Sequence, residues 1–311
     1  INTRRWIMIT YKTDSKTSLQ SAESSMPVLA MCYDFDKTLT PDDMQAQGFI
    51  QSVGFDVDEF WAEANQMAVE NNMDGNLAYM YKMLVESEGQ LIVKKENLMD
   101  YGAKVQLYPG VATWFKRICQ YGLDHGVKIE HYIISSGLKE MIEGTQMAKE
   151  GDFKRIYASA FYYNKKGVAK CPAQAINYTN KTQFLFRIQK GVLDINDSSV
   201  NDYIRPENQR VPFRNIVYMG DSDTDIPCMS LVNTNGGHSI GVYDPNSLDK
   251  SKVQRMMVHK RIRHYAPADY REGTELDFLV KTIIQQTAAR EKLERAYVKQ
   301  MKESYEKDSI Q

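Results

Sequence analysis

The sequence predicts an α/β fold: a doubly wound, mainly parallel sheet core with an all-helical cap inserted after its first strand. Three short apolar runs each end abruptly in polar residues, which is typical of strands buried on both faces. A long stretch between the first two runs has helical periodicity and no strand pattern. The three runs cover residues 28–33, 129–134 and 215–219, and the helical stretch covers residues 41–106.

The composition is that of an ordinary globular protein. The 311 residues are 42% hydrophobic and 25% charged, enough for about two domains, or one domain with an insert. A net charge of −1 argues against a dedicated nucleic-acid-binding protein, and no apolar run approaches the roughly 18 residues of a membrane span. Four scattered cysteines without a C-x-x-C pair exclude a disulfide scaffold and favour a cytoplasmic location.

Residues 1–25 are predicted to be a polar N-terminal leader. Arg4-Arg5 and the short apolar run after them resemble a twin-arginine export signal only faintly, because residues 11–16 are polar where an apolar region should lie. Met26 stands just before the first predicted strand, so we expect the functional chain to start there.

Residues 26–40 and 107–288 are predicted to form a Rossmann-like core. An amphipathic helix over residues 109–121 precedes the second strand, and the Lys-Lys-Gly sequence at 165–167 predicts a hairpin-like turn. The polar segment 194–213 is expected to be a surface excursion. Because ligands bind at the carboxyl ends of strands in open α/β sheets, the polar residues after each apolar run are candidates for the site.

The predicted cap, residues 41–106, places apolar residues at helical spacing, as in Phe60, Ala64 and Met67. A second helical stripe covers residues 276–284 near the C-terminus. The chain then becomes strongly charged, so residues 289–311 are predicted to be a helix or tail that is solvated or associates with a second copy in a homodimer.

Four aspartates are the candidates for chemistry. Asp34 and Asp36 follow the first apolar run, and Asp221 and Asp225 follow the third. Two charges about 4 Å apart repel by roughly 4 kcal/mol at an effective dielectric near 20, so a cluster requires a bound cation, a nearby lysine or protonation. Oxygen ligands alone suit Mg²⁺ better than zinc. A calcium loop over residues 221–225 is the alternative, but Ile226 stands where such a loop needs glycine.

These residues resemble the motifs of the haloacid dehalogenase-like superfamily of phosphohydrolases. Residues 34–40 (DFDKTLT) resemble its first motif and residues 220–225 (GDSDTD) its fourth, while Ser135 and Lys181 match the second and third by position. The similarity extends over residues 28–285. A second aspartate at position 36 is the pattern of phosphatase and phosphotransferase members. A helical insert directly after the first motif is similar to the cap of the phosphoserine phosphatase-like branch.

The resemblance implies a phosphatase that acts on a small phosphorylated metabolite through an aspartyl-phosphate. Asp34 would be the nucleophile, and Asp36 would protonate the leaving group and then take a proton from the attacking water. Thr38 would orient Asp36. A phosphotransferase or mutase would use the same aspartyl-phosphate while excluding water, and a catalytically idle metal-binding protein would keep only the fold.

The resemblance also implies how phosphate and metal are held. Ser135 and the amide of Ser136 would bind phosphoryl oxygens, and Lys181 would offset the charge on the transferring group. Lys165, Lys166, Lys170 and Lys190 are alternatives to Lys181. The implied Mg²⁺ site comprises Asp34, Asp36, Asp221 and Asp225, with Asp225 fixing Lys181 or a metal-bound water.

The sequence leaves the chemical class of the substrate open. Asp43 occupies the place where phosphoserine-specific members of the family hold the amine of the substrate. Those members hold the carboxylate of the substrate with an arginine, and residues 41–113 contain none. Lysines at 82, 94, 95 or 104 could substitute without the bidentate geometry of arginine. Twelve acidic side chains and four lysines give residues 41–106 a net charge of −8. This charge would favour neutral or cationic leaving groups, such as an amino alcohol, or would simply be a solvated surface.

Overall fold

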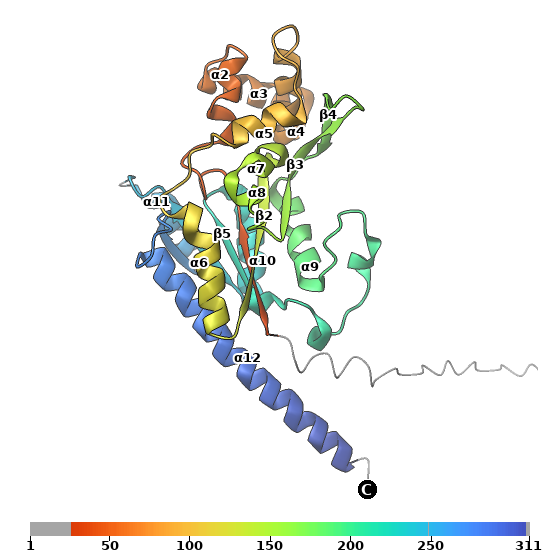
Figure 1. Ribbon diagram of the computed structural model, residues 1–311, viewed down its shortest axis with the longest axis vertical. Helices are drawn as coiled ribbons and strands as arrows, with labels where there is room; N and C mark the ends of the chain where they lie inside the picture. Colours follow the sequence, from red (N-terminus) through yellow and green to blue (C-terminus); the bar gives the residue numbers. More distant parts are fainter. Residues whose placement is uncertain (1–25, 248, 309–311) are drawn as a thin grey trace, which may run out of the picture.

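The computed structural model describes residues 26–247 and 249–308, so the predicted leader lies outside the described residues. Seven strands form one sheet in the order β4-β3-β2-β1-β5-β6-β7, and every neighbouring pair is parallel except β3 and β4 (Figure 1). The predicted doubly wound α/β fold is confirmed. The strands are β1 (Val28–Tyr33), β2 (Lys128–Leu138), β3 (Arg155–Tyr163), β4 (Ala169–Gln174), β5 (Ile216–Gly220), β6 (His238–Tyr243) and β7 (His264–Pro267).

The central strand β1 fixes the position of the site. It pairs with β2 on one side and β5 on the other, so the chain winds outward from β1 in both directions. The carboxyl ends of these three strands therefore meet at the point where the strand order reverses, which is where open α/β sheets bind ligands.

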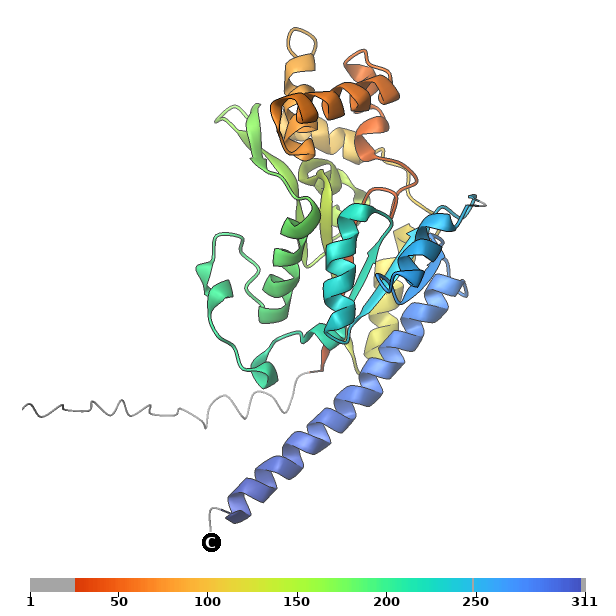
Figure 2. The same ribbon diagram turned by 180° about the vertical axis from the view of Figure 1, so that it is seen from behind.

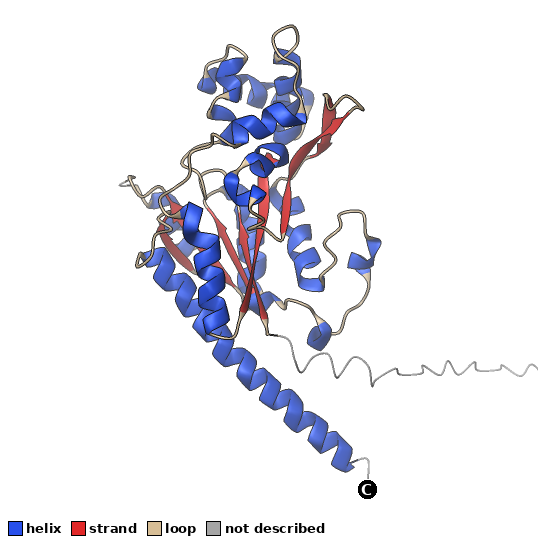
Figure 3. Ribbon diagram, in the orientation of Figure 1, coloured by secondary structure: helices blue, strands red, loops and turns tan. Residues whose placement is uncertain are grey.

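Helices lie on both faces of the sheet (Figure 3). An apolar core lies between the sheet and the helices on each face. One contains Trp114 and Phe115 of the predicted amphipathic helix, and the other contains Phe184 and Met229. The core helices are α6 (Val111–Asp124), α7 (Lys139–Gly144), α8 (Gln146–Lys149), α9 (Thr182–Lys190), α10 (Ile226–Thr234), α11 (Ser251–Val258) and α12 (Glu275–Asp308).

The segment after β1 is helical, as predicted, and lies beyond the carboxyl edge of the sheet (Figure 1). An aspartate N-cap begins each of its two longest helices: Asp56 accepts hydrogen bonds from two amides of α3, and Asp74 from two of α4. The elements of the segment are the 3₁₀ turn η1 (Met44–Ala46), α2 (Phe49–Ser52), α3 (Val57–Asn71), α4 (Gly75–Glu86) and α5 (Lys95–Gly102).

Helix α5 crosses helix α7 of the core at two glycines, one in each helix. A Cβ atom on Gly102 would lie 1.8 Å from the carbonyl oxygen of Met141 in α7, and one on Gly144 would lie 2.0 Å from that of Met99 in α5. The backbones of α5 and α7 are thus so close that neither position has room for a side chain. This crossing fixes the helical segment to the element that follows β2.

The predicted hairpin is confirmed, because β3 and β4 are antiparallel and their connection spans residues 164–168. Residues 194–213 contain short 3₁₀ turns and no longer helix or strand, as expected of a surface excursion. Helix α12 buries Leu276, Val280 and Ile284, then projects past the sheet with Leu293 and Tyr297 exposed (Figure 2). The predicted homodimer stays a prediction. No helix among the described residues is long and apolar enough to cross a bilayer.

Candidate active site

Asp34 directly follows the last residue of β1, where β1 pairs with β5. Its backbone amide donates a 2.9 Å hydrogen bond to the carbonyl of Met219, which continues the pairing of the two strands. Asp34 is 5% exposed, and the Oδ1 atom of its carboxylate accepts no hydrogen bond from any described residue. Its described partner is the ammonium of Lys181, 3.4 Å away, so this oxygen still has hydrogen-bonding capacity for a ligand.

Asp36 is positioned by the turn that follows. Leu39 donates its amide to the carbonyl of Phe35, and Lys37 adopts a left-handed φ of 57°, so the chain reverses sharply after β1. The amide of Met44 in η1 donates a 2.8 Å hydrogen bond to Asp36 Oδ1. The helical segment therefore holds the second aspartate of the motif directly.

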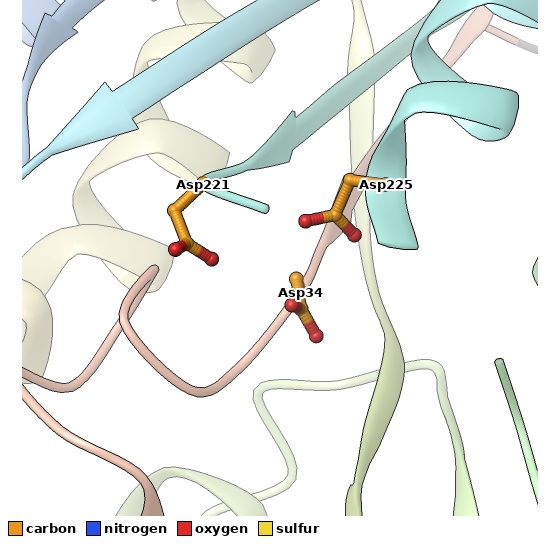
Figure 4. A group of neighbouring side chains, drawn as sticks. All are labelled: Asp34, Asp221 and Asp225. Carbon is orange, nitrogen blue, oxygen red and sulfur yellow. The ribbon is translucent and has the colours of Figure 1, made fainter. Parts of the chain in front are cut away.

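Asp221 and Asp225 leave the end of β5 and approach Asp34. One carboxylate oxygen from each of the three aspartates lies within 4.8 Å of the others, as neighbours in Figure 4. Gly220 makes this arrangement possible, since a Cβ atom there would lie 2.5 Å from the Asp225 carboxylate. Asp223 of the same segment is exposed, so the acidic residues do not all turn toward one ion as a calcium loop would require.

The carboxylate of Asp225 is already fully hydrogen-bonded. Its Oδ1 accepts from Lys181 Nζ at 2.7 Å and from the Tyr218 hydroxyl at 2.8 Å. Its Oδ2 accepts from the amide and hydroxyl of Ser222 at 3.1 and 3.0 Å. Four donors fix Asp225 in place, and its geometry favours holding Lys181 over binding a metal directly.

Lys181 is the cation at the centre of the site. It ends the 3₁₀ turn η2 (Tyr178–Lys181) just before α9, is fully buried, and places Nζ 3.4 Å from Asp34 Oδ1. Burial alone would lower the pKa of Lys181, but the carboxylates of Asp225 and Asp34 raise it above its ordinary value. The ammonium group therefore stays charged beside the candidate nucleophile.

Crowding of carboxylates raises the pKa values of three site aspartates. Burial, followed by the Asp225 charge, raises the pKa of Asp34 to about 6, although Lys181 opposes the change. Burial and the charges of Asp225 and Asp34 raise the pKa of Asp221 to about 8. Burial and the charges of Asp43 and Asp34 raise the pKa of Asp36 well above its usual range. This concentration of negative charge is what a divalent cation would neutralise.

Ser135 and Ser136 lie near the carboxyl end of β2, on the strand next to β1. Ser135 is fully buried and its hydroxyl accepts a 3.0 Å hydrogen bond from the amide of Gly137, while the buried Ser136 hydroxyl has no partner among the described residues. A Cβ atom on Gly137 would lie 2.6 Å from Asp36 Oδ2, so this position needs glycine. The hydroxyl of Thr38 is buried without a described partner, and orientation of Asp36 by Thr38 stays a prediction.

A cavity of about 330 Å³ separates this group from the helical segment. Its floor is the aspartate and serine cluster just described, and its opposite wall comes from η1, α3 and α4. Asp43 lines the cavity, but its carboxylate is paired with Lys37 at 2.8 Å. The residues around it are Asp34, Asp36, Lys37, Asp43, Gln45, Trp61, Asn76, Tyr79, Ser135, Ser136, Gly137, Asp221, Ser222, Thr224 and Lys252.

None of the four lysines considered as substitutes for a substrate-binding arginine (82, 94, 95 and 104) lines this cavity. Lys82 is 1% exposed and lies inside the helical segment, where Glu63 and Glu86 accept its hydrogen bonds at 2.5 and 3.0 Å. Lys95 pairs with Glu143 of α7 at 2.9 Å. Of the twelve acidic residues in 41–106, only Asp42 and Asp43 approach Lys37, and only Asp43 lines the cavity.

Sequence patterns missed part of the site. Gln45 and Lys252 carried no signal, because each is one of several polar residues in its stretch of sequence and belongs to no motif. The hydroxyl of Tyr218 lies in an apolar strand run and was indistinguishable from core. Trp61 and Tyr79 were two of several aromatic residues in the insert, and only the packing of α3 against α4 brings them together.

The comparisons with known proteins agree with this fold. The family model for haloacid dehalogenase-like hydrolases matches residues 32–230. An uncharacterized protein of Borreliella burgdorferi is 26% identical over 275 residues, which cover 80% of this chain and 94% of that protein.

Two crystal structures share the fold at low sequence identity. A HAD family hydrolase from Salmonella enterica serovar Typhi has a TM-score of 0.53 at 16% identity, covering 83% of this chain and 72% of that one. A probable phosphoserine phosphatase from Vibrio cholerae has a TM-score of 0.51 at 12% identity, covering 88% and 72%. With the family model matched across the aspartates of both strand ends, the chain belongs to the haloacid dehalogenase-like hydrolases.

Proposed function

We propose that this chain is a magnesium-dependent phosphatase that hydrolyses a small phosphorylated metabolite of the cytoplasm through an aspartyl-phosphate. One observation carries the proposal. The buried Asp34 carboxylate faces a cavity of about 330 Å³, with one oxygen free of hydrogen bonds and a buried lysine 3.4 Å away. A carboxylate beside a fixed cation in a small cavity suits in-line attack on a phosphomonoester.

In the first step, Asp34 attacks phosphorus, a carboxylate O–P bond forms, and the P–O bond to the leaving group breaks. Asp36 gives its proton to the departing oxygen. In the second step, Asp36 takes a proton from water as that water attacks the phosphorus, which releases inorganic phosphate and the free Asp34 carboxylate. The raised pKa of Asp36 suits a group that is protonated before the first step.

The residues present fit a magnesium ion. Asp34 and Asp221 offer carboxylate oxygens, with the backbone carbonyl of Asp36 as the third protein ligand, and oxygen ligands are those that Mg²⁺ prefers. When bound, Mg²⁺ supplies positive charge that polarises the phosphoryl group and reduces its repulsion from Asp34. We assign Asp225 to holding Lys181, because its oxygens already accept four hydrogen bonds.

The phosphoryl oxygens are bound by groups at the end of β2 and by Lys181. The Ser135 hydroxyl, the amide of Ser136 and the Lys181 ammonium are the candidate donors. Both serines line the cavity, and the Ser136 hydroxyl has no described partner, so it also has hydrogen-bonding capacity to spare.

Phosphate release tests the proposal. The purified chain is incubated with p-nitrophenyl phosphate and a panel of phosphomonoesters, with Mg²⁺ or with a chelator, and free phosphate is measured. We expect release that needs Mg²⁺ and that Asp34→Asn abolishes, while the exposed neighbour variant Asp223→Asn retains it. Transfer of phosphate to an alcohol without release would favour a phosphotransferase, and activity of Asp34→Asn equal to wild type would exclude the assigned nucleophile.

A further inference from the structure

The wall of the cavity opposite the aspartates contains uncharged hydrogen-bonding and aromatic side chains. Gln45 comes from η1, Trp61 from α3, and Asn76 and Tyr79 from α4. The one carboxylate on this side, Asp43, is paired with Lys37. The acidic surface of residues 41–106 is therefore not the surface that a leaving group meets.

Two polar atoms of this wall are buried without partners. Gln45 is 2% exposed, and its Oε1 atom accepts no hydrogen bond from any described residue. The Trp61 indole Nε1–H is likewise buried with no described acceptor. A buried polar group that stays unsatisfied is costly, so both atoms favour a ligand that pairs with them. One is an acceptor and the other a donor, so together they match a group that both donates and accepts.

A hydroxyl is such a group, since it carries one donor and two lone pairs. A quaternary ammonium can satisfy neither atom. A primary ammonium can donate to Gln45 Oε1 and a carboxylate can accept from Trp61, but the two lysines that line the cavity already face carboxylates, Lys37 that of Asp43 and Lys252 that of Asp221. A charged leaving group would therefore be buried here without a counter-ion of its own. The rings of Trp61 and Tyr79, in edge contact with centroids 5.5 Å apart, add an apolar surface for carbon atoms.

The same residues are tied to the reacting groups. The Tyr79 hydroxyl donates a 3.0 Å hydrogen bond to the carbonyl of Ser136. Gln45 directly follows Met44, whose amide holds Asp36. The wall is thus fixed relative to the phosphate end of the cavity, and a leaving group that fits it is aligned with Asp36.

We infer that the leaving group is a neutral, hydroxylated molecule, a polyol or sugar, held by Gln45 Oε1 and Trp61 Nε1–H. This inference rests on the proposed phosphatase activity. The leaving group is then selected by hydrogen bonds to two uncharged side chains and not by the negative charge of residues 41–106. Amino-alcohol phosphates and phosphoserine become poor substrates.

The test measures kcat/KM for glycerol 2-phosphate, glucose 6-phosphate, phosphocholine and phosphoserine, each relative to p-nitrophenyl phosphate. We expect the wild type to favour a hydroxylated substrate. Gln45→Met and Trp61→Phe keep the side-chain size or ring and remove the polar atom. Each should lower the specificity ratio for the hydroxylated substrate by about 10- to 100-fold. The exposed variant Gln66→Met, on the same helix as Trp61, is the matched control and should leave the ratio unchanged.

A binding measurement tests this inference independently of the proposed hydrolysis. The affinity of the same phosphorylated compounds for wild type and Gln45→Met is measured by calorimetry, whether or not phosphate is released. Weaker binding of the polyol or sugar phosphate to Gln45→Met supports the inference even in a chain without hydrolysis. A preference for phosphocholine or phosphoserine, or equal ratios and affinities in the variants and wild type, would overturn it.

Discussion

The Lys181 ammonium donates a 2.7 Å hydrogen bond to Asp225 Oδ1, and neither side chain is exposed to solvent. The same ammonium lies 3.4 Å from Asp34. A buried ion pair is costly to form but more costly to break, because removal of one partner leaves a charge without compensation. Asp225 therefore determines where the cation beside Asp34 lies, although it does not itself face the cavity.

We predict that Asp225→Asn lowers the free energy of unfolding by about 3–5 kcal/mol and also reduces phosphate release. Lys181→Met should be destabilising as well. The double variant should lose less than the sum of the two, by about 1 kcal/mol or more, since neither charge is left unpaired. Urea unfolding in magnesium-free buffer measures all three, and additivity within about 0.5 kcal/mol would mean that the two residues act independently.

Magnesium is predicted to stabilise the fold. Three carboxylate oxygens within 4.8 Å repel one another in the metal-free chain, and binding to the folded state alone contributes about 2.7 kcal/mol at a concentration 100 times the dissociation constant. Asp221→Asn removes one carboxyl group that the folded chain keeps from ionising and one proposed ligand. The variant should melt at a higher temperature than wild type without Mg²⁺, yet gain much less from its addition.

Thermal melts with and without Mg²⁺ test this, with Asp223→Asn as the control for loss of an exposed charge in the same segment. Equal gains from Mg²⁺ in Asp221→Asn and wild type would show that Asp221 is not a ligand.

The crossing of α5 and α7 yields a prediction about substrate binding. Gly144→Ala would place a methyl group 2.0 Å from the Met99 carbonyl, so α5 must move and the wall of the cavity moves with it. We expect a loss of about 1–3 kcal/mol of stability and a higher KM.

Gly75→Ala is the matched control, because a Cβ atom at Gly75 in α4 meets nothing within 4 Å. That variant should be neutral or slightly stabilising. Equal effects of the two substitutions in unfolding and steady-state assays would refute a close helix crossing.

The pH dependence of stability is predicted to include a contribution from His131 in the core. Its Nδ1 lies 3.0 Å from the Tyr33 hydroxyl, which accepts from Trp114, and its Nε2 lies 3.2 Å from the Phe115 carbonyl. Burial lowers the pKa of His131 from 6.5 to about 4, so the folded chain holds it neutral. This contribution is complete above pH 6.5 and is lost as the pH falls toward 4, at up to about 1.4 kcal/mol per unit.

Urea unfolding of wild type and His131→Gln between pH 7 and pH 4.5 isolates that contribution. The site aspartates with raised pKa values change stability in the opposite direction, but they are common to both proteins and cancel in the difference. The advantage of wild type over the variant should shrink as the pH falls. A difference that is constant with pH would show that His131 is not buried in its neutral form.

Sequence patterns predicted the strands that carry the site because β1, β2 and β5 are buried on both faces and each contains a short, mainly apolar run that is followed by polar residues. They missed β6, which begins with His238 and Ser239, and β7, which has only four residues. Two polar residues at the start of β6, and the edge position and short length of β7, remove the apolar signal. The aspartates followed from their place after apolar runs, and Lys181 from the start of a helix. The wall made by Gln45, Trp61 and Tyr79 could not be predicted, since it depends on how three helical elements pack.

The central claim is that Asp34 becomes phosphorylated during turnover. The wild-type chain is mixed with p-nitrophenyl phosphate and Mg²⁺, quenched in acid within the first turnover, digested, and examined by mass spectrometry. We predict a peptide containing residues 28–40 that carries one added phosphoryl group on Asp34, and no such peptide from Asp34→Asn. A phosphoryl group on another residue, or wild-type turnover by Asp34→Asn, would contradict the account.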